Sequence, residues 1–410
     1  MITLALRSAA LAAALLPTLA GAAALSLEQA LDLAVQRSAT MQAAQAGTLS
    51  ATEAARVAGR LPDPVLSAGI DNVPATGRDR FTTTADFMTA KRVGLSQEWL
   101  SADKRAAQRA AAQAAVDREA AAAHIAAAET RLQTALAYVD AFYATETLQL
   151  TDLAEHYGQE EFETARAKLA AATGTGQEAL AMSSARGVAE DAAAEARQAQ
   201  RQAQIQLSRW TGEAVEGLAA PAFAAPPDEP AFVASHPAVV AAQRDVELAR
   251  QEASVTQANR QPNWTWSLSY GQRTGYGDMV SAGVSIPIPI APARRQDRET
   301  ASKLALVDKA QANLAEAERV AATEYRSLAT DAERWAQRLQ RYRAAVLEPA
   351  RQRIAVATAG YGSNQAPLVA LFEARDAELA AQRKLLSLQR ELARARAQLA
   401  FKPVPEGAAR

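Results

Sequence analysis

One pattern occurs twice along the chain, and it limits the possible architectures more than any other feature. Residues 60–64 (RLPDP) and 260–263 (RQPN) each end a helical stretch. Each is followed by two short strand-like segments and then by a very long helical run. That run breaks once at a glycine-rich turn, at residues 174–176 in the first half and 360–362 in the second. A repeat with only two strands cannot close a sheet, so we expect the chain to assemble with copies of itself.

Composition favours long helices and excludes several classes of site. Of the 410 residues, 49% are hydrophobic but only 5% are aromatic, which is typical of close-packed helices rich in alanine. The formal net charge is -1, so no basic field indicates a nucleic-acid partner. The absence of cysteine excludes disulfides, thiolate metal sites and an N-terminal lipid anchor. The three histidines are scattered in the sequence, and we expect neither a metal site nor a cofactor.

The N-terminus has the pattern of a secretory signal peptide. Arg7 supplies a positive charge, residues 9–19 are apolar, and small residues at Ala20, Ala22 and Ala24 form cleavage motifs. The alternative is a buried N-terminal helix; the run is too short to cross a membrane. No later segment approaches 18 apolar residues. The prediction is a signal peptide over 1–24 and, in a Gram-negative source, a mature protein in the periplasm or outer membrane.

The mature chain divides into two structural repeats joined by a proline-rich linker. In each repeat we expect a helix, two strands and a long helical hairpin, with Ser26 capping the first helix. The predicted boundaries are a first repeat over 25–220 with strands at about 65–73 and 91–99, a linker over 221–234, a second repeat over 235–402 with strands at about 264–270 and 279–288, and a C-terminal tail over 403–410.

The helical runs are too long for a compact domain. No proline occurs in the 146 residues between Pro74 and Pro221. A helix over 101–172 would be on the order of 100 Å long, at about 1.5 Å per residue. Its larger apolar residues follow coiled-coil spacing, with Glu146 as the one polar exception. The prediction is a long antiparallel coiled coil.

The strands alternate strictly between large apolar and small polar residues. Trp264, Trp266 and Tyr270 fall on one face of the clearest strand, and Trp99 falls on the corresponding face of an earlier one. In a soluble sheet such a face would be core, whereas in an outer-membrane barrel it would meet lipid. Open strand edges are not tolerated in lipid. We favour the membrane interpretation, in which these aromatic residues form the girdle. That interpretation therefore requires an oligomer.

The order of these elements resembles the TolC-type outer membrane efflux proteins. Residues 25–31 (LSLEQAL), 359–362 (AGYG) and 368–374 (LVALFEA) resemble that family's signatures, and the resemblance covers residues 25–402. The order of the motifs is specific, whereas each motif alone is weak. Further stretches resemble the branch that accompanies heavy-metal efflux pumps, namely 61–69 (LPDPVLSAG), 86–89 (DFMT) and 94–98 (GLSQE).

The resemblance implies a mainly α protein that forms a homotrimer. Four strands from each protomer would close one transmembrane β-barrel in outer-membrane lipid, and the helices would form a tunnel across the periplasm. A periplasmic adaptor protein and an inner-membrane efflux pump would deliver a heavy metal or a drug to the tunnel. Such a channel is not an enzyme, and it opens by helix movement.

The resemblance also implies a constriction at the periplasmic end. Tyr361 matches the aromatic position and Glu373 the inner acidic position, whereas Ala366 and Ala370 stand where the best-known member has a basic and a second acidic residue. An ionic latch is therefore not visible in this segment. Three Glu373 side chains around one axis would favour cations; the alternative is an ordinary lumen or surface carboxylate.

Two turns are expected at the far tips of the helical hairpins, over 173–177 and 360–365. Small residues there allow close backbone approach, so we predict that these tips contact the adaptor. The residues concerned are Gly174, Thr175, Gly176, Gly360, Gly362 and Ser363.

Two other functions remain open from the sequence. The same fold could serve as the exit duct of a protein or peptide secretion system, which the helices cannot distinguish from efflux. Alternatively, the chain could be a periplasmic coiled-coil adaptor without a pore. A heat-modifiable outer-membrane trimer would argue against that second alternative.

Overall fold

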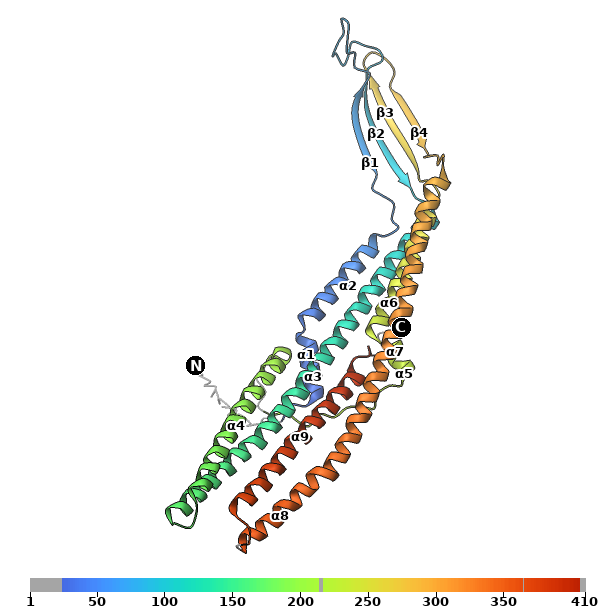
Figure 1. The fold of residues 1–410 in the computed structure, drawn as a ribbon. Helices are drawn as coiled ribbons and strands as arrows, with labels where there is room; N and C mark the ends of the chain where they lie inside the picture. The colour runs from blue at the N-terminus through green and yellow to red at the C-terminus, as the bar shows by residue number, and fades with distance from the viewer. Residues whose placement is uncertain (1–23, 214–216, 364, 406–410) are drawn as a thin grey trace, which may run out of the picture.

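The chain forms a long, curved body with a small sheet at one end and helices along the rest (Figure 1). The structure, a computed structural model, describes residues 24–213, 217–363 and 365–405. The predicted signal peptide lies outside these residues except for Ala24, and so does the part of the predicted tail beyond residue 405. In the described residues, no helix is both long and apolar enough to cross a membrane.

Four helices build the first half of the body. They are α1 (Leu27–Arg37), α2 (Ala39–Val57), α3 (Ala102–Ala170) and α4 (Gly176–Thr211). Ser26 caps α1 as predicted, and its hydroxyl accepts a hydrogen bond from the Gln29 backbone. The prediction of one continuous helix to about residue 60 was wrong. Ser38 has an extended backbone, ends α1 and caps α2 with its own hydroxyl.

The second half contains more helical segments than the sequence predicted. It comprises α5 (Glu229–Ala234), α6 (Pro237–Ala258), a 3-10 turn (Pro292–Arg294), α7 (Gln296–Tyr342), a π-helical turn (Arg343–Leu347), α8 (Glu348–Gly362) and α9 (Leu368–Phe401). Helix α5 lies inside the predicted linker, because Asp228 caps it and Phe232 is fully buried. The π turn precedes Pro349, whose ring would clash with the Ala345 carbonyl of a regular α-helix.

The four strands form one antiparallel sheet in the order β1-β2-β3-β4. Their bounds are β1 (Val65–Asp71), β2 (Ala90–Trp99), β3 (Trp264–Arg273) and β4 (Met279–Ser285). Strand β4 ends three residues before the predicted boundary at 288. Pro287 and Pro289 follow it and cannot donate a ladder hydrogen bond. The sheet extends beyond the ends of the helices, and none of the described helices covers either of its faces (Figure 1).

The main core lies between the helices near the middle of the body. Tyr138 of α3 is 0% exposed, and its hydroxyl lies 2.6 Å from the Leu25 carbonyl oxygen and 2.7 Å from that of Ala219. Leu25 and Leu218 form a parallel β-bridge there. The cluster around Tyr138 consists of Leu27, Ala30, Leu31, Ala135, Ala141, Leu207 and Ala397.

The C-terminal segment is tied into the helical body rather than free of it. Val404 is 1% exposed, and its backbone N–H donates to the Ser235 carbonyl oxygen at 2.8 Å. The Lys402 ammonium bonds to Glu324, which also lies 3.3 Å from Nε2 of the buried His236. The first residues of the predicted tail therefore belong to the core.

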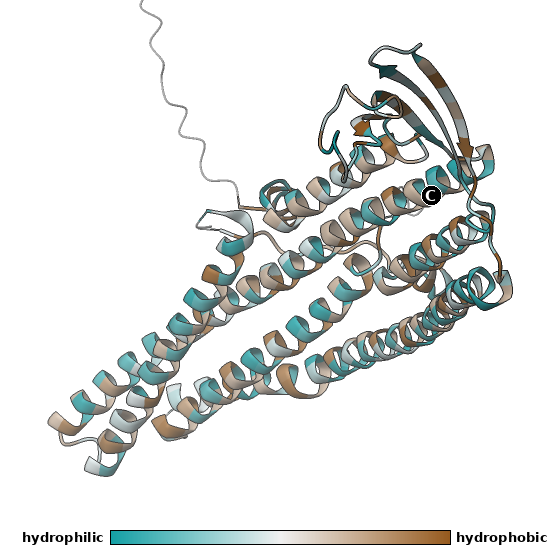
Figure 2. Ribbon diagram, turned by 90° about the horizontal axis from the view of Figure 1, so that it is seen from above, coloured by the Kyte–Doolittle hydropathy of each residue, from teal (hydrophilic) through white to brown (hydrophobic). Residues whose placement is uncertain are grey.

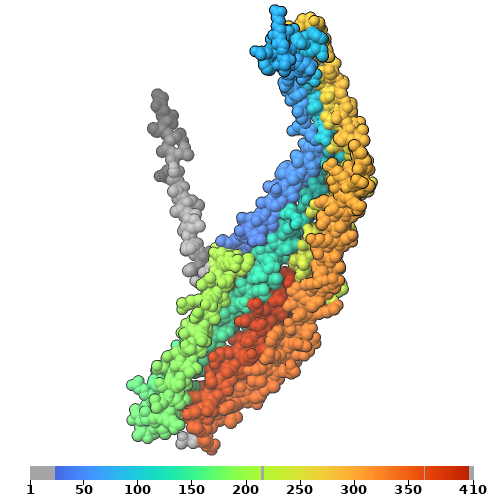
Figure 3. Space-filling view, turned by 45° about the horizontal axis from the view of Figure 1, so that its top comes forward, coloured from blue at the N-terminus to red at the C-terminus, as the bar shows by residue number. Residues whose placement is uncertain are grey.

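Helices α4 and α8 mark opposite edges of the body. In the space-filling view α4 follows one edge, while α7 and α8 follow the other (Figure 3). Coloured by hydropathy, the strands carry several apolar positions along their length (Figure 2), and many of these side chains are exposed. The apolar side chains of the helices, in contrast, lie largely between helices.

Candidate membrane sheet and channel tip

Pairing across the sheet gathers the large apolar side chains of all four strands on one face. Tyr270 lies opposite Val93 on one side and Val280 on the other, and Leu268 lies opposite Leu95. Because side chains alternate along a strand, residues opposite each other share a face. This face, called the apolar face below, comprises Leu66, Ala68, Ile70, Lys91, Val93, Leu95, Gln97, Trp99, Trp264, Trp266, Leu268, Tyr270, Gln272, Val280, Ala282 and Val284.

The opposite face is made mostly of small and polar residues, with Val65 and Met279 as apolar exceptions at the strand ends. Gly94 lies between Ser67 and Ser269, and Ser267 lies opposite Gly283. A Cβ atom added at Gly94 would come within 3.0 Å of both neighbouring serine side chains. Its charged members are at the strand ends, where Arg92 pairs with Asp71 at 2.9 Å. Neither face is covered by other described residues, so this sheet has no core of its own in the part of the chain that the structure describes.

Aromatic residues mark both ends of the apolar face. At the helix end, Trp99 and Trp264 lie with ring centroids 5.9 Å apart. At the far end, Phe87 and Tyr276 of the two loops pair at 6.0 Å. The sequence analysis missed this second pair, because two loop residues about 190 positions apart give no periodic signal. An apolar band between aromatic levels is the pattern of outer-membrane strands.

A buried lysine connects the sheet to the helices. Lys104, near the start of α3, is 4% exposed, and its ammonium donates to the Gln261 carbonyl oxygen at 2.7 Å and to Asn263 Oδ1 at 2.5 Å. The Asn263 amide donates in turn to Glu98 of β2 at 2.6 Å. Burial lowers the pKa of Lys104, and the nearby Glu98 carboxylate opposes that effect. This network joins the first-half strand pair to the entry of β3.

The structure places Tyr361 and Glu373 near the same tip but in different surroundings. Tyr361, near the end of α8, is half-buried against a cluster that includes Met182 and Phe372, and the Lys168 ammonium lies 4.6 Å from its ring centroid. Glu373 of α9 is exposed and lies 3.6 Å from Arg353 of α8. The sequence analysis saw no ionic latch within the segment that holds Glu373, and Arg353 lies outside that segment. This basic partner of Glu373 lies one helix away, where a search of that segment could not find it.

A second ion pair joins α9 to α3 close by. Arg375 lies 3.2 Å from Glu161 and 4.9 Å from the ring centroid of Tyr157. Burial raises the pKa of Glu161 to about 7, although the hydrogen bond from Arg375 lowers it. Glu161 and Glu373 line a groove of about 520 Å³ between α3, α4 and α9. The sequence alone gives no sign of this contact, because Arg375 and Glu161 lie 214 positions apart.

The two hairpin tips differ in how they turn. At the first, Thr175 caps α4 and the backbone N–H groups of Thr173 and Gly174 donate to Lys168 of α3. At the second, Gly360 and Gly362 belong to α8, which corrects the predicted turn over 360–365. The turn begins only at Ser363, whose hydroxyl bonds to the carbonyl oxygens of Ala359 and Gly360.

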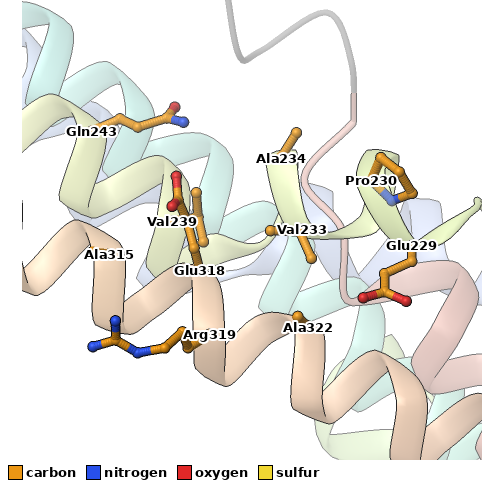
Figure 4. A pocket seen from close by; sticks show the side chains of 10 residues that line it. All are labelled: Glu229, Pro230, Val233, Ala234, Val239, Gln243, Ala315, Glu318, Arg319 and Ala322. Carbon is orange, nitrogen blue, oxygen red and sulfur yellow. The ribbon is translucent and has the colours of Figure 1, made fainter.

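A shallow hollow of about 700 Å³ lies between α5, α6 and α7 (Figure 4). Its lining includes the apolar Val233 and Val239 and the charged Glu229, Glu318 and Arg319. The Glu229 and Glu318 carboxylates lie apart (Figure 4). Among the described residues no three His, Cys, Asp or Glu side chains come together as a metal site.

Comparisons with solved structures identify this fold. No protein-family model and no curated relative matches the sequence. The CmeC outer membrane channel of Campylobacter jejuni superposes with a TM-score of 0.77 at 13% identity, over 92% of this chain and 85% of that chain. The outer membrane protein VceC of Vibrio cholerae gives 0.73 at 20% identity, over 92% and 96%. The open MtrE channel of Neisseria gonorrhoeae gives 0.73 at 16%, over 92% and 88%. The chain has the fold of TolC-type outer membrane channels, as the sequence resemblance predicted.

Proposed function

We propose that the chain is the outer-membrane channel of a tripartite efflux system, a passive duct from the periplasm to the outside. The observation that carries this proposal is the uncovered apolar face of a sheet that has two open edges. In water such a face would cost free energy, and in lipid it is the expected exterior. A channel of this kind performs no chemistry, so we assign no catalytic residue.

Closing the sheet requires further copies of the chain. Strands β1 and β4 each have one unpaired edge, and unsatisfied backbone groups are not tolerated in lipid. Three protomers with four strands each would form one barrel of twelve strands, and the two structural repeats would alternate around it. The small polar face would line the lumen. The helical body would then extend into the periplasm as an α-barrel.

The lower end of the duct is the proposed constriction. Three Glu373 carboxylates near the axis would attract cations, and Arg353 would offset part of that charge. In single-channel recordings Glu373→Gln should lower the preference for cations, whereas Arg353→Gln should raise it. The test is whether the two substitutions change the cation preference in opposite directions. A general loosening of the tip would change it in the same direction in both variants.

Tyr361 is proposed to keep the resting channel narrow through packing. Its ring lies against α3 and the start of α9, so removing it should loosen both hairpins at the tip. Tyr361→Ala should raise the resting conductance, and Tyr361→Phe should not, because the ring packs while its hydroxyl has no partner among the described residues. An equal rise in both variants would contradict the packing role.

The hairpin tips are proposed to dock the periplasmic adaptor. Both lie at the end of the body farthest from the sheet (Figure 1). Photocrosslinkers at Thr175 and Ser363 should capture the adaptor, whereas one at Thr76 in the β1–β2 loop should not. Capture from Thr76 alone would show that the orientation is inverted.

Reconstitution in planar bilayers tests the proposed function against its alternatives. A channel gives discrete conductance steps from trimers extracted from the outer membrane, whereas a periplasmic adaptor without a pore gives none. A strain that lacks this gene should become sensitive to heavy metals or drugs if the duct serves an efflux pump. Retained resistance with a loss of secreted proteins would favour the protein-secretion duct instead.

A further inference from the structure

We propose that Lys91 and Gln272 bind a phosphate of an outer-leaflet glycolipid at the outer rim of the sheet. Lys91 is the single charged residue on the apolar face, whose other members are apolar or neutral. It lies at the end farthest from the helices, between Ile70 of β1 and Gln272 of β3. This inference rests on the proposed function, because it requires the apolar face to meet lipid.

The ammonium of Lys91 has no partner within the described part of the chain. Its side chain is exposed, and neither a hydrogen bond nor an ion pair connects it to another residue there. The same holds for the carboxamide of Gln272, its cross-strand neighbour. Two donor groups thus stand side by side on a face otherwise suited to lipid. We therefore expect an anion from outside the chain to balance the charge of the Lys91 ammonium.

Three acidic residues of this end are already engaged elsewhere. Asp71 pairs with Arg92 at 2.9 Å on the opposite face. Asp278 accepts from the Tyr270 hydroxyl, and Asp86 accepts from the Met88 backbone at 2.6 Å. None of these carboxylates neutralises Lys91.

The position of Lys91 along the sheet places its ammonium at the level of the lipid headgroups rather than in the hydrocarbon. Lys91 and Trp99 are eight residues apart on β2, or about 26 Å at about 3.3 Å per residue. The lipid-facing band of an outer-membrane barrel is about 25 Å tall. If Trp99 and Trp264 lie at the periplasmic interface, Lys91 therefore reaches the outer headgroups, near the Phe87–Tyr276 pair. Phosphate oxygens suit an ammonium and an amide donor.

The site is complete within one protomer. Strand β2 is flanked by β1 and β3 of the same chain, so a neighbouring copy that pairs at β1 or β4 would not cover Lys91. The acyl chains of a bound glycolipid would then lie along Val93, Leu95 and Leu268 on the same face. A free phosphate ion would gain only the two polar contacts and none of the apolar ones.

Binding of diphosphoryl lipid A to the purified trimer tests the site, measured by native mass spectrometry over a lipid titration. The Lys91→Met variant should bind the lipid at least about tenfold more weakly. This is the loss of affinity expected when one charge-assisted hydrogen bond is removed. Lys91→Arg should bind like the wild type. Arg92→Met is the matched control, because it removes an equal charge one residue away on the opposite face.

Three results would overturn the proposal. Lys91→Met could bind as tightly as the wild type, or lipid A without its phosphates could bind the wild type equally well. Alternatively, millimolar inorganic phosphate could displace the lipid, which would assign the site to free anions. Bilayer conductance of each variant is recorded beforehand, so a failure of the channel itself would be seen before any lipid is added.

Discussion

Apolar side chains of the helical body and of the sheet have opposite surroundings. In the body, Phe232 and Leu207 are 0% exposed and pack between helices. In the sheet, Leu268 is 48% exposed and Val280 is 72% exposed. The body therefore carries its own core, whereas the sheet presents its apolar side chains outward and depends on what surrounds it. The Lys104 network lies at the junction between these two regions.

The comparison implies that the two regions are sensitive to different kinds of substitution. Removing bulk should damage the body, because a cavity remains where a side chain was packed. Adding charge should damage the sheet, because the new charge would face hydrocarbon.

The largest effect is expected for Phe232→Ala in the body. The Phe232 ring lies 5.3 Å from that of Tyr325 and 5.8 Å from that of His236. Its removal should lower the free energy of unfolding by about 3–5 kcal/mol, measured by urea titration with circular dichroism. Phe81→Ala is the control, because Phe81 is 74% exposed in the β1–β2 loop. Equal destabilisation by both would remove the distinction between core and surface.

On the sheet, Leu268→Arg should make the free energy of membrane insertion about 2–4 kcal/mol less favourable. Ser267→Arg, on the opposite face, should be better tolerated. Leu180→Arg should be neutral, because Leu180 of α4 is 74% exposed on the helical body, which meets water. The measurement is the yield of folded, heat-modifiable trimer in outer membranes. Equal tolerance at Leu268 and Ser267 would refute the lipid-facing assignment.

A smaller effect is expected for Tyr138→Phe, which removes a hydroxyl from the core without changing its packing. The Leu25 and Ala219 carbonyl oxygens would lose their hydrogen-bond donor, which should lower the free energy of unfolding by about 1–3 kcal/mol. Tyr325→Phe should cost less, since its hydroxyl bonds only to the Pro227 carbonyl oxygen at 3.2 Å. Urea titration should rank the two variants in this order; the reverse order would place the critical hydroxyl elsewhere.

Glu161 should make the tip sensitive to pH. Burial raises the pKa of Glu161 in the folded chain to about 7 from an ordinary value of 4.5, so the folded state binds its proton more tightly than the unfolded state does. Stability should then fall as the pH rises from about 4.5 to about 7. Glu161→Gln should abolish this slope, whereas Glu160→Gln should keep most of it, because the Glu160 side chain is 56% exposed and its charge raises the pKa of Glu161 less than burial does. Thermal unfolding across this pH range provides the measurement, and an unchanged slope in Glu161→Gln would reject the assignment.

Local signals in the sequence predicted most of the fold. Period-two alternation marked β3 and β4, prolines marked strand and helix ends, and Ser26 was recognised as a cap. Such signals depend on residues a few positions apart. The break at Ser38 was missed because a single serine inside a helical pattern usually stays helical, and the π turn was missed because its cause, Pro349, reads as an ordinary helix start.

The candidate site was harder to predict because its contacts cross between elements. Glu373 was named from the sequence, but its partner Arg353 lies on a different helix, 20 positions earlier. Lys91 and Gln272 are neighbours only through strand register, which pairing sets and spacing does not. Trp99 was named from the sequence as a girdle residue, whereas the Phe87–Tyr276 pair required the two loops to be placed together.

Tryptophan quenching by lipids with brominated acyl chains tests the central claim most directly. The five tryptophans divide between the two regions, with Trp99, Trp264 and Trp266 on the apolar face and Trp210 and Trp335 on helices. Five single-tryptophan variants in proteoliposomes would each report one position. The account predicts strong quenching of the three sheet tryptophans and none of Trp210 and Trp335. Sheet tryptophans that stay as bright as Trp210 would contradict it, because the apolar face would then not lie in lipid.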